Sequence, residues 1–60
     1  MNLVQKIEFI QGEIKKAFAE NRCPTWEEIA NKCEGGEDVL FALNDLGLIS
    51  VEGDQIVNAV

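Results

Sequence analysis

Hydrophobic residues recur every three or four positions through the first third of the chain. The positions that fall on one face of a helix with 3.6 residues per turn are Leu3, Ile7, Ile10, Ile14 and Phe18. Asn2 stands directly before them and is a good helix-capping residue. The pattern therefore predicts a first helix over about residues 2–20, with its apolar face toward the core, which weakens around Glu20 and Asn21.

Two further helices are predicted in the middle of the chain. After Pro24, Thr25 and Glu28 have the spacing of a capping box, which indicates a helix over about residues 25–33. Gly35 and Gly36 break that helix, and a third follows over about residues 36–46. The apolar positions expected on the inner faces of these two helices are Trp26, Ile29, Ala30, Cys33, Val39, Leu40, Leu43 and Leu46.

The last residues indicate the end of the third helix followed by a β-hairpin. Gly47 suits the left-handed position after a helix, from which Leu48 can fold back on the helix end. Extended segments at about 49–52 and 55–58 flank Gly53 and Asp54, which suit a type II′ turn that places Val51 opposite Ile56. We expect a mainly α fold with a small β-hairpin over about residues 48–59, in a single domain of residues 1–60. The residues expected to be buried are Ile14, Trp26, Ile29, Leu43 and Leu46.

The composition limits what such a chain can be. Sixty residues, 47% of them hydrophobic, can build one small core, and domains of this size often gain stability from a partner or a second copy. No apolar run approaches the ~18 residues of a membrane span, and the N-terminus lacks a signal-peptide pattern, so we expect a cytoplasmic protein without membrane contact.

The sequence offers little for catalysis or metal binding. It has no histidine and no tyrosine, and Thr25 and Ser50 are its only hydroxyl side chains, so no nucleophile and base can be paired. The only cysteines, Cys23 and Cys33, are separated by a predicted helix that rises about 12 Å, which is too far for a disulfide. We expect Cys23 in a loop, Cys33 in the core, and no catalytic, cofactor or metal site.

Two segments resemble a known family. The run Pro24-Thr25-Trp26-Glu27-Glu28-Ile29-Ala30 is similar to the second helix of LexA-type repressors and other bacterial winged-helix regulators, and Leu43-Asn44-Asp45-Leu46-Gly47-Leu48-Ile49 is similar to the exit from their third helix. The resemblance implies a three-helix winged helix-turn-helix. It also implies that the third helix would be the recognition helix in the DNA major groove and that the hairpin would be the wing.

The distribution of charge opposes a DNA-binding role for that third helix. Residues 1–32 contain all five basic residues and five acids, whereas residues 33–60 contain six acids and no base, so the net charge of −6 lies entirely in the second half. Affinity for DNA comes largely from lysine and arginine that neutralise phosphates. The outward positions of the third helix are Glu37, Asp38, Phe41, Asn44 and Asp45, of which only Asn44 is a plausible base reader.

These five residues are the candidate partner-binding site. Our first hypothesis is a non-enzymatic winged-helix interaction or regulatory module whose acidic third helix and wing dock on a partner protein with a basic surface. One alternative is a DNA-binding transcriptional regulator that acts as a dimer through Lys15, Lys16, Arg22 and Lys32. Another is a DNA mimic that inhibits a nucleic-acid-binding protein, and an acidic face that serves only solubility is a further interpretation.

A second candidate surface lies on the first helix. Phe9 projects away from the apolar face, with Gly12 and Lys16 nearby. A glycine inside a helix is unfavourable by roughly 1 kcal/mol relative to alanine, so Gly12 suggests close packing by another backbone. Phe9, Gly12 and Lys16 are therefore the candidate self-association residues of a homodimer.

Overall fold

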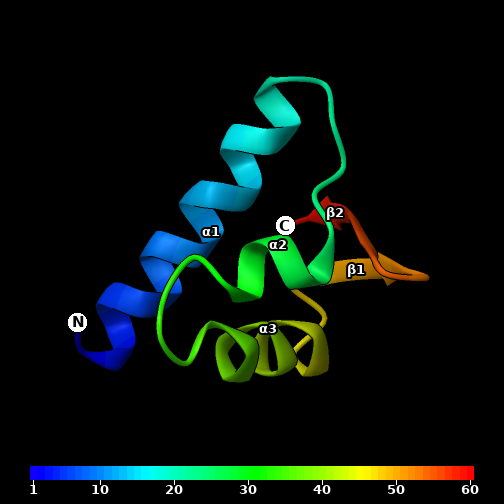
Figure 1. The fold of residues 1–60 in the computed structure, drawn as a ribbon. Helices are drawn as coiled ribbons and strands as arrows, with labels where there is room; N and C mark the ends of the chain where they lie inside the picture. Colours follow the sequence, from blue (N-terminus) through cyan, green and yellow to red (C-terminus); the bar gives the residue numbers. More distant parts are fainter.

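The computed structural model describes residues 1–60 and contains three helices followed by a two-stranded antiparallel hairpin. The elements are α1 (Leu3–Ala19), α2 (Trp26–Ala30), α3 (Gly36–Asp45), β1 (Ile49–Glu52) and β2 (Gln55–Ala59). Figure 1 shows α1 along one side of the molecule, α3 beneath α2, and the hairpin projecting on the side away from α1. The predicted mainly α class with a small β-hairpin is confirmed, and the order of elements is compatible with a winged-helix layout.

Local hydrogen bonds fix both ends of α1. At the start, the Asn2 side chain accepts a hydrogen bond from the Gln5 N–H (2.8 Å), and the Gln5 side chain accepts one from the Asn2 N–H (3.1 Å). At the end, Asn21 adopts a left-handed φ of 61°, and the Arg22 N–H donates to the Ala17 carbonyl at 3.1 Å. Asparagine is the residue other than glycine that most readily tolerates this conformation. The predicted start and end of this helix are both confirmed.

Helix α2 is shorter than the sequence pattern predicted. It ends at Ala30, so the expectation of a helix to Cys33 is wrong. The reason lies in the start of α3, where a Cβ on Gly36 would stand only 2.6 Å from the Ala30 carbonyl oxygen. The chain must turn before Cys33 to bring the two backbones this close. Both thiols are free, Cys23 is exposed, and Cys33 packs half-buried against the core from the connecting loop.

The end of α3 forms the predicted capping motif but exposes a residue expected in the core. Gly47 has a φ of 75°, and the Leu48 N–H donates to the Leu43 carbonyl at 2.9 Å, as in a Schellman motif. Leu46 is 72% exposed, so its predicted burial is wrong. The helix ends at Asp45 and the chain reverses there, so that Leu48 rather than Leu46 packs against the core.

The hairpin has the predicted pairing and is also tied to the helices. Val51 lies opposite Ile56, and Gly53 has a positive φ of 64° at the first position of the turn. On its other edge β2 pairs with the segment before α2. There the Ile56 N–H donates to the Pro24 carbonyl (2.8 Å), and the Trp26 N–H donates to the Asp54 carbonyl (2.6 Å). These bonds hold the hairpin turn next to the first residue of α2.

All five elements contribute to one hydrophobic core. Its buried members are Ile10, Ile14, Ile29, Val39, Leu40, Leu43, Ile49 and Ile56. The predicted burial of Ile14, Ile29 and Leu43 is confirmed. Trp26 packs against this cluster but is only half buried, so the prediction of a buried tryptophan is wrong. No helix has both the length and the apolar character needed to cross a membrane.

Phe9 also differs from its prediction. It is half buried and packs against the core instead of projecting into solvent. Helix α1 contacts α2, α3 and β2, which together cover a wider arc of the helix than the single apolar stripe in the sequence. A large side chain outside the stripe, such as that of Phe9, can then still pack against the core.

Candidate interaction surface

Helix α3 presents the candidate partner-binding residues on its outer face. Its inner face is fixed by the burial of Val39, Leu40 and Leu43, and residues on the opposite side of a 3.6-residue helix must then face outward. The residues that the structure exposes there are Glu37, Asp38, Phe41, Asn44 and Asp45. Phe41 is 56% exposed, whereas the other three aromatic residues, Phe9, Phe18 and Trp26, are half buried.

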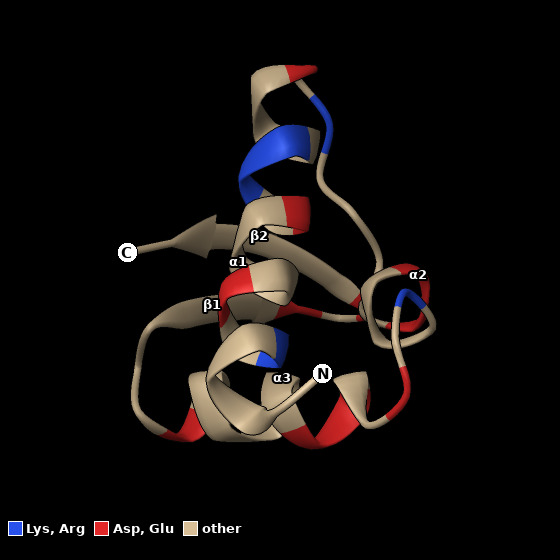
Figure 2. Ribbon diagram, turned by 90° about the vertical axis from the view of Figure 1, so that its left-hand side faces the viewer, with Lys and Arg blue, Asp and Glu red and all other residues tan.

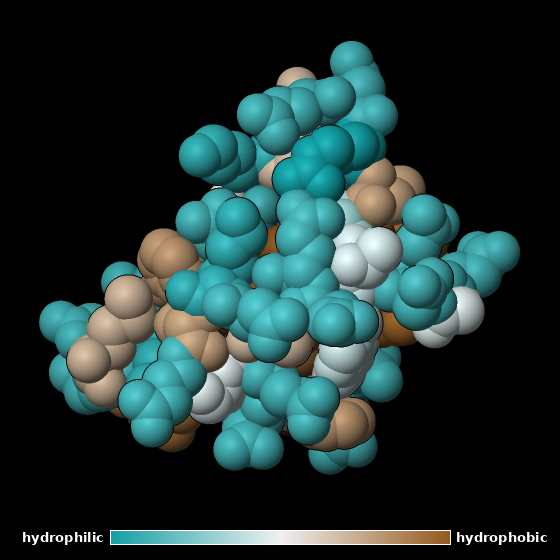
Figure 3. All heavy atoms as spheres, in the orientation of Figure 1, coloured by the Kyte–Doolittle hydropathy of each residue, from teal (hydrophilic) through white to brown (hydrophobic).

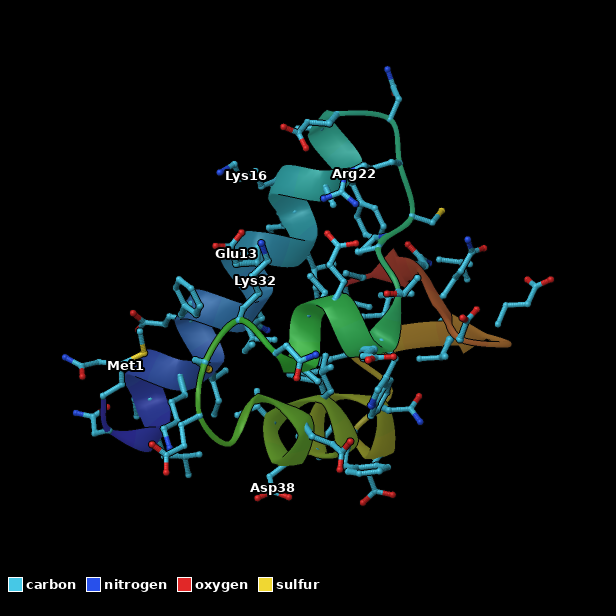
Figure 4. The ribbon with its side chains drawn as sticks, viewed as in Figure 1. Met1, Glu13, Lys16, Arg22, Lys32 and Asp38 are labelled. Atoms are coloured by element: carbon cyan, nitrogen blue, oxygen red, sulfur yellow. The ribbon has the colours of Figure 1, made fainter.

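The structure divides these five residues between two shallow hollows. Phe41, Asn44 and Asp45 line one hollow together with Ala42. Glu37 and Asp38 line another, which continues into the loop that joins α2 to α3. Figure 4 shows the Asp38 carboxylate pointing away from the rest of the molecule. The two acids at the start of α3 are favoured there by the helix dipole, so their position has a local explanation as well.

Trp26 is an aromatic residue beside this face that the sequence analysis did not place on the surface. Its ring lies against that of Phe41, with the ring centroids 5.0 Å apart and the planes tilted by 59°. Tilted aromatic pairs at this separation attract each other beyond the burial of their area. Trp26 also lines a third shallow hollow, between the start of α2 and the hairpin turn. The only feature of the sequence that indicated a partly exposed Trp26 was its position as the first residue of the helix, directly after the N-cap Thr25.

The aromatic pair joins the two hollows on either side of it into one surface. The residues of this aromatic–acidic surface are Thr25, Trp26, Glu27, Phe41, Ala42, Asn44, Asp45, Val51, Gly53 and Asp54. It contains three carboxylates and no lysine or arginine, and none of its carboxylates takes part in an ion pair. Figure 2 shows acidic residues and no basic residue on α3, whereas α1 carries residues of both signs.

Arg22 forms ion pairs with Glu20 and Glu28 beyond the end of α1. Its guanidinium donates two hydrogen bonds to the Glu28 carboxylate, at 3.0 and 2.7 Å, and lies 3.5 Å from a Glu20 oxygen. The hydrogen bond and the opposite charge of Glu28 raise the pKa of Arg22. The same contacts with Arg22 hold the pKa of Glu28 below its ordinary value, against a smaller opposing effect of desolvation. This bond also explains why Glu28 does not complete the capping box with Thr25.

The Arg22–Glu28 bond is expected to make the local structure sensitive to acid. Because folding lowers the pKa of Glu28, the bond stabilises the fold above the unfolded-state value of about 4.3 and is lost as the pH falls through the lowered folded-state value. Arg22→Gln should therefore shift the pKa of Glu28 upward toward that of an ordinary glutamate, measured by carboxyl NMR titration. Lys15→Gln is the control and should leave it unchanged. An identical Glu28 titration in the parent and in Arg22→Gln would contradict this assignment.

The candidate self-association residues lie at different depths. Gly12 and Lys16 are exposed on α1, and a Cβ on Gly12 would meet no atom within 4 Å. Phe9 does not belong to this surface, because it packs against the core.

A comparison with protein-family models, curated proteins and solved structures finds no match to this chain. No three histidine, cysteine or acidic side chains lie together as metal ligands would. What the aromatic–acidic surface offers is two aromatic rings to bury and several carboxylates to pair, which suits binding of another macromolecule.

Proposed function

We propose that this chain is a non-enzymatic winged helix-turn-helix module that binds a basic surface of a partner protein through its aromatic–acidic surface. The observation that carries the proposal is the exposed Phe41 ring, held against Trp26 among carboxylates with no cation beside them. In this proposal the third helix and the wing keep the positions that the family resemblance implies, but they contact protein instead of DNA.

The two kinds of residue would make different contributions to binding. Aromatic side chains near the centre of an interface commonly supply much of the binding energy, and Trp26 and Phe41 are already packed against each other. Surrounding carboxylates attract a basic partner over a longer range and so raise the association rate. Asp38 and Asp45 stand three residues before and four residues after Phe41, so they flank it on the same face of α3.

A DNA-binding regulator that acts as a dimer is the second candidate. The observation in its favour is that Lys15, Lys16 and Lys32 are exposed and take part in no ion pair. These cations lie on α1 and after α2, whereas α3 offers phosphates only carboxylates, Phe41 and Asn44. Such a protein would have to approach DNA with a surface other than its third helix. A DNA mimic would instead present the acids of α3 in place of phosphates, with a nucleic-acid-binding protein as its partner.

Capture followed by titration tests the proposal. The tagged chain and its Phe41→Ala variant are used to capture proteins from an extract of the source cells, and the protein that binds only the parent chain is purified. The single tryptophan, Trp26, then reports directly on the surface. Binding of the purified partner should protect Trp26 from quenching by acrylamide. Phe41→Ala should weaken this complex by about 1–3 kcal/mol, mainly through faster dissociation.

Charge reversal distinguishes the effect of the acidic surface on binding from the effect of the chain's net charge. Asp45 belongs to the aromatic–acidic surface, and Asp38 lies outside it but one turn before Phe41 on the same face of α3. Asp38→Lys with Asp45→Lys should lower the association rate and its dependence on salt. Glu8→Lys with Glu13→Lys makes the same change in net charge on α1 and should leave the complex nearly intact. If the parent captures nothing that the Phe41→Ala variant fails to capture, or if binding leaves Trp26 unprotected, the proposal is wrong. Tight, salt-sensitive binding of duplex DNA by the parent chain would favour the second candidate.

A further inference from the structure

We propose that two copies of this chain associate through the outer face of α1, with the two helices antiparallel and Gly12 near the centre of the contact. The outer face consists of Val4, Gln5, Glu8, Gly12, Lys15, Lys16 and Ala19, all of which are exposed. None of these residues belongs to the aromatic–acidic surface. The inference therefore does not depend on the proposed function.

Gly12 gives the face a place where a second backbone can approach. It lies inside a helix of 17 residues, where glycine is less favourable than alanine, and no local turn or positive φ requires it. Within the chain, the space where its Cβ would stand is empty. The absence of a side chain thus serves nothing in the single copy and would allow closer packing of two helices.

The charges on either side of Gly12 are placed so that those of one copy can pair with those of a second copy. Glu8 and Lys15 lie on this face, and neither takes part in an ion pair within the chain. A two-fold axis between Gln11 and Gly12 puts Glu8 of one copy opposite Lys15 of the second copy, because each lies about 5 Å along the helix from the axis. The symmetry repeats the pair, so one contact contains two ion pairs.

The same axis places the apolar residues at the two ends of the face opposite each other. It places Val4 of one copy opposite Ala19 of the second copy, so that the 62% exposed Val4 side chain gains an apolar neighbour. Figure 3 shows hydrophobic residues gathered over the start of α1, where Met1 and Leu3 are also more than 60% exposed. In Figure 2, where α1 faces the viewer, the other end of the helix carries a basic band. An antiparallel arrangement keeps the two basic bands apart, whereas a parallel one would place Glu8 beside Glu8 and Lys15 beside Lys15.

The contact is small, and this sets the affinity to expect. One helix face of about 25 Å in length buries less area than the ~1,000 Å² of a typical stable interface. The dimer should therefore form at high micromolar to millimolar protein concentration. Because the aromatic–acidic surface uses other elements, the dimer would present two copies of that surface to a partner.

Sedimentation equilibrium over this concentration range tests the proposal by a charge swap. The parent chain should approach twice its mass of 6.7 kDa. Glu8→Lys alone and Lys15→Glu alone each place like charges opposite each other and should weaken self-association at least about tenfold. The double variant Glu8→Lys with Lys15→Glu has the net charge of the parent and should restore it. Glu13→Lys is the control, since it makes the same charge change as Glu8→Lys off the outer face.

Gly12→Ala adds an independent readout. It should raise the melting temperature of the dilute, monomeric chain and yet weaken self-association, because the added methyl group separates the two helices. A parent chain that stays monomeric at millimolar concentration would overturn the proposal. So would a double variant that associates no better than Glu8→Lys alone, or a Gly12→Ala chain that associates more strongly than the parent.

Discussion

Leu43→Ala is expected to lower the free energy of unfolding by about 2–5 kcal/mol, enough to unfold much of so small a domain. Leu43 is only 3% exposed and belongs to the core cluster to which all five elements contribute. Removing most of its side chain loses buried apolar area and leaves a cavity that the neighbouring elements can fill only in part. Urea denaturation followed by circular dichroism measures the change.

Leu46→Ala is the matched control, because it makes the same substitution three residues later. Leu46 is 72% exposed and lies at the cap of α3, so its truncation should change the free energy of unfolding by less than about 0.5 kcal/mol. Similar destabilisation by both substitutions would mean that α3 is rotated or longer than in this structure. A melting temperature of Leu43→Ala within a few degrees of the parent would contradict the placement of its inner face.

Gly36→Ala is the second substitution with a large expected effect. Its new Cβ would stand 2.6 Å from the Ala30 carbonyl oxygen and 3.2 Å from the carbonyl carbon, both of them backbone atoms that cannot move aside as a flexible side chain does. The start of α3 would have to shift away from the end of α2. Overpacking of this kind costs about 1–3 kcal/mol, which exceeds the helix propensity gained by alanine at the first position of a helix.

Gly12→Ala makes the same substitution at another glycine but is expected to have the opposite effect on stability. Gly12 lies within α1 with no atom near its missing Cβ, so alanine there should stabilise the monomer by about 0.5–1 kcal/mol. Thermal and urea denaturation of the two variants at low micromolar concentration, where self-association is negligible, provide the comparison. If Gly36→Ala is as stable as the parent, the close approach of α2 and α3 described above is wrong.

These substitutions also bear on the proposed function, because the core and the aromatic–acidic surface share α3. Leu43 fixes which side of the helix faces inward, and this in turn fixes the direction of Phe41 and Asp45. The contact of Gly36 with Ala30 sets how closely α3 lies to α2, and so contributes to the position of Phe41 against Trp26. A variant that loosens the α2–α3 contact should therefore also expose Trp26 more fully to acrylamide.

The sequence by itself determined the features that depend on neighbouring residues along the chain. Asn2 and Thr25 begin helices because their side chains accept hydrogen bonds from backbone N–H groups three residues later. Gly47 ends α3 and Gly53 leads the hairpin turn because both positions require a positive φ. The period of the apolar residues identified the outer face of α3, including the exposure of Phe41, since inner and outer positions follow directly from 3.6 residues per turn.

Only the tertiary structure decided the features in which separate segments meet. The early end of α2 follows from the approach of Gly36 to Ala30, and nothing in the local pattern of Ala30 to Cys33 signals it.

The packing of the elements also decided which apolar side chains remain exposed. Leu46 has the spacing of a core residue but lies where the chain has already turned away, whereas Phe9 lies outside the apolar stripe but is covered by neighbouring elements. Trp26 became part of a surface because hydrogen bonds from Trp26 to Asp54 and from Ile56 to Pro24 bring the hairpin to the start of α2. Periodicity tells which side of a helix is apolar, but how far that side is buried depends on the elements packed against it.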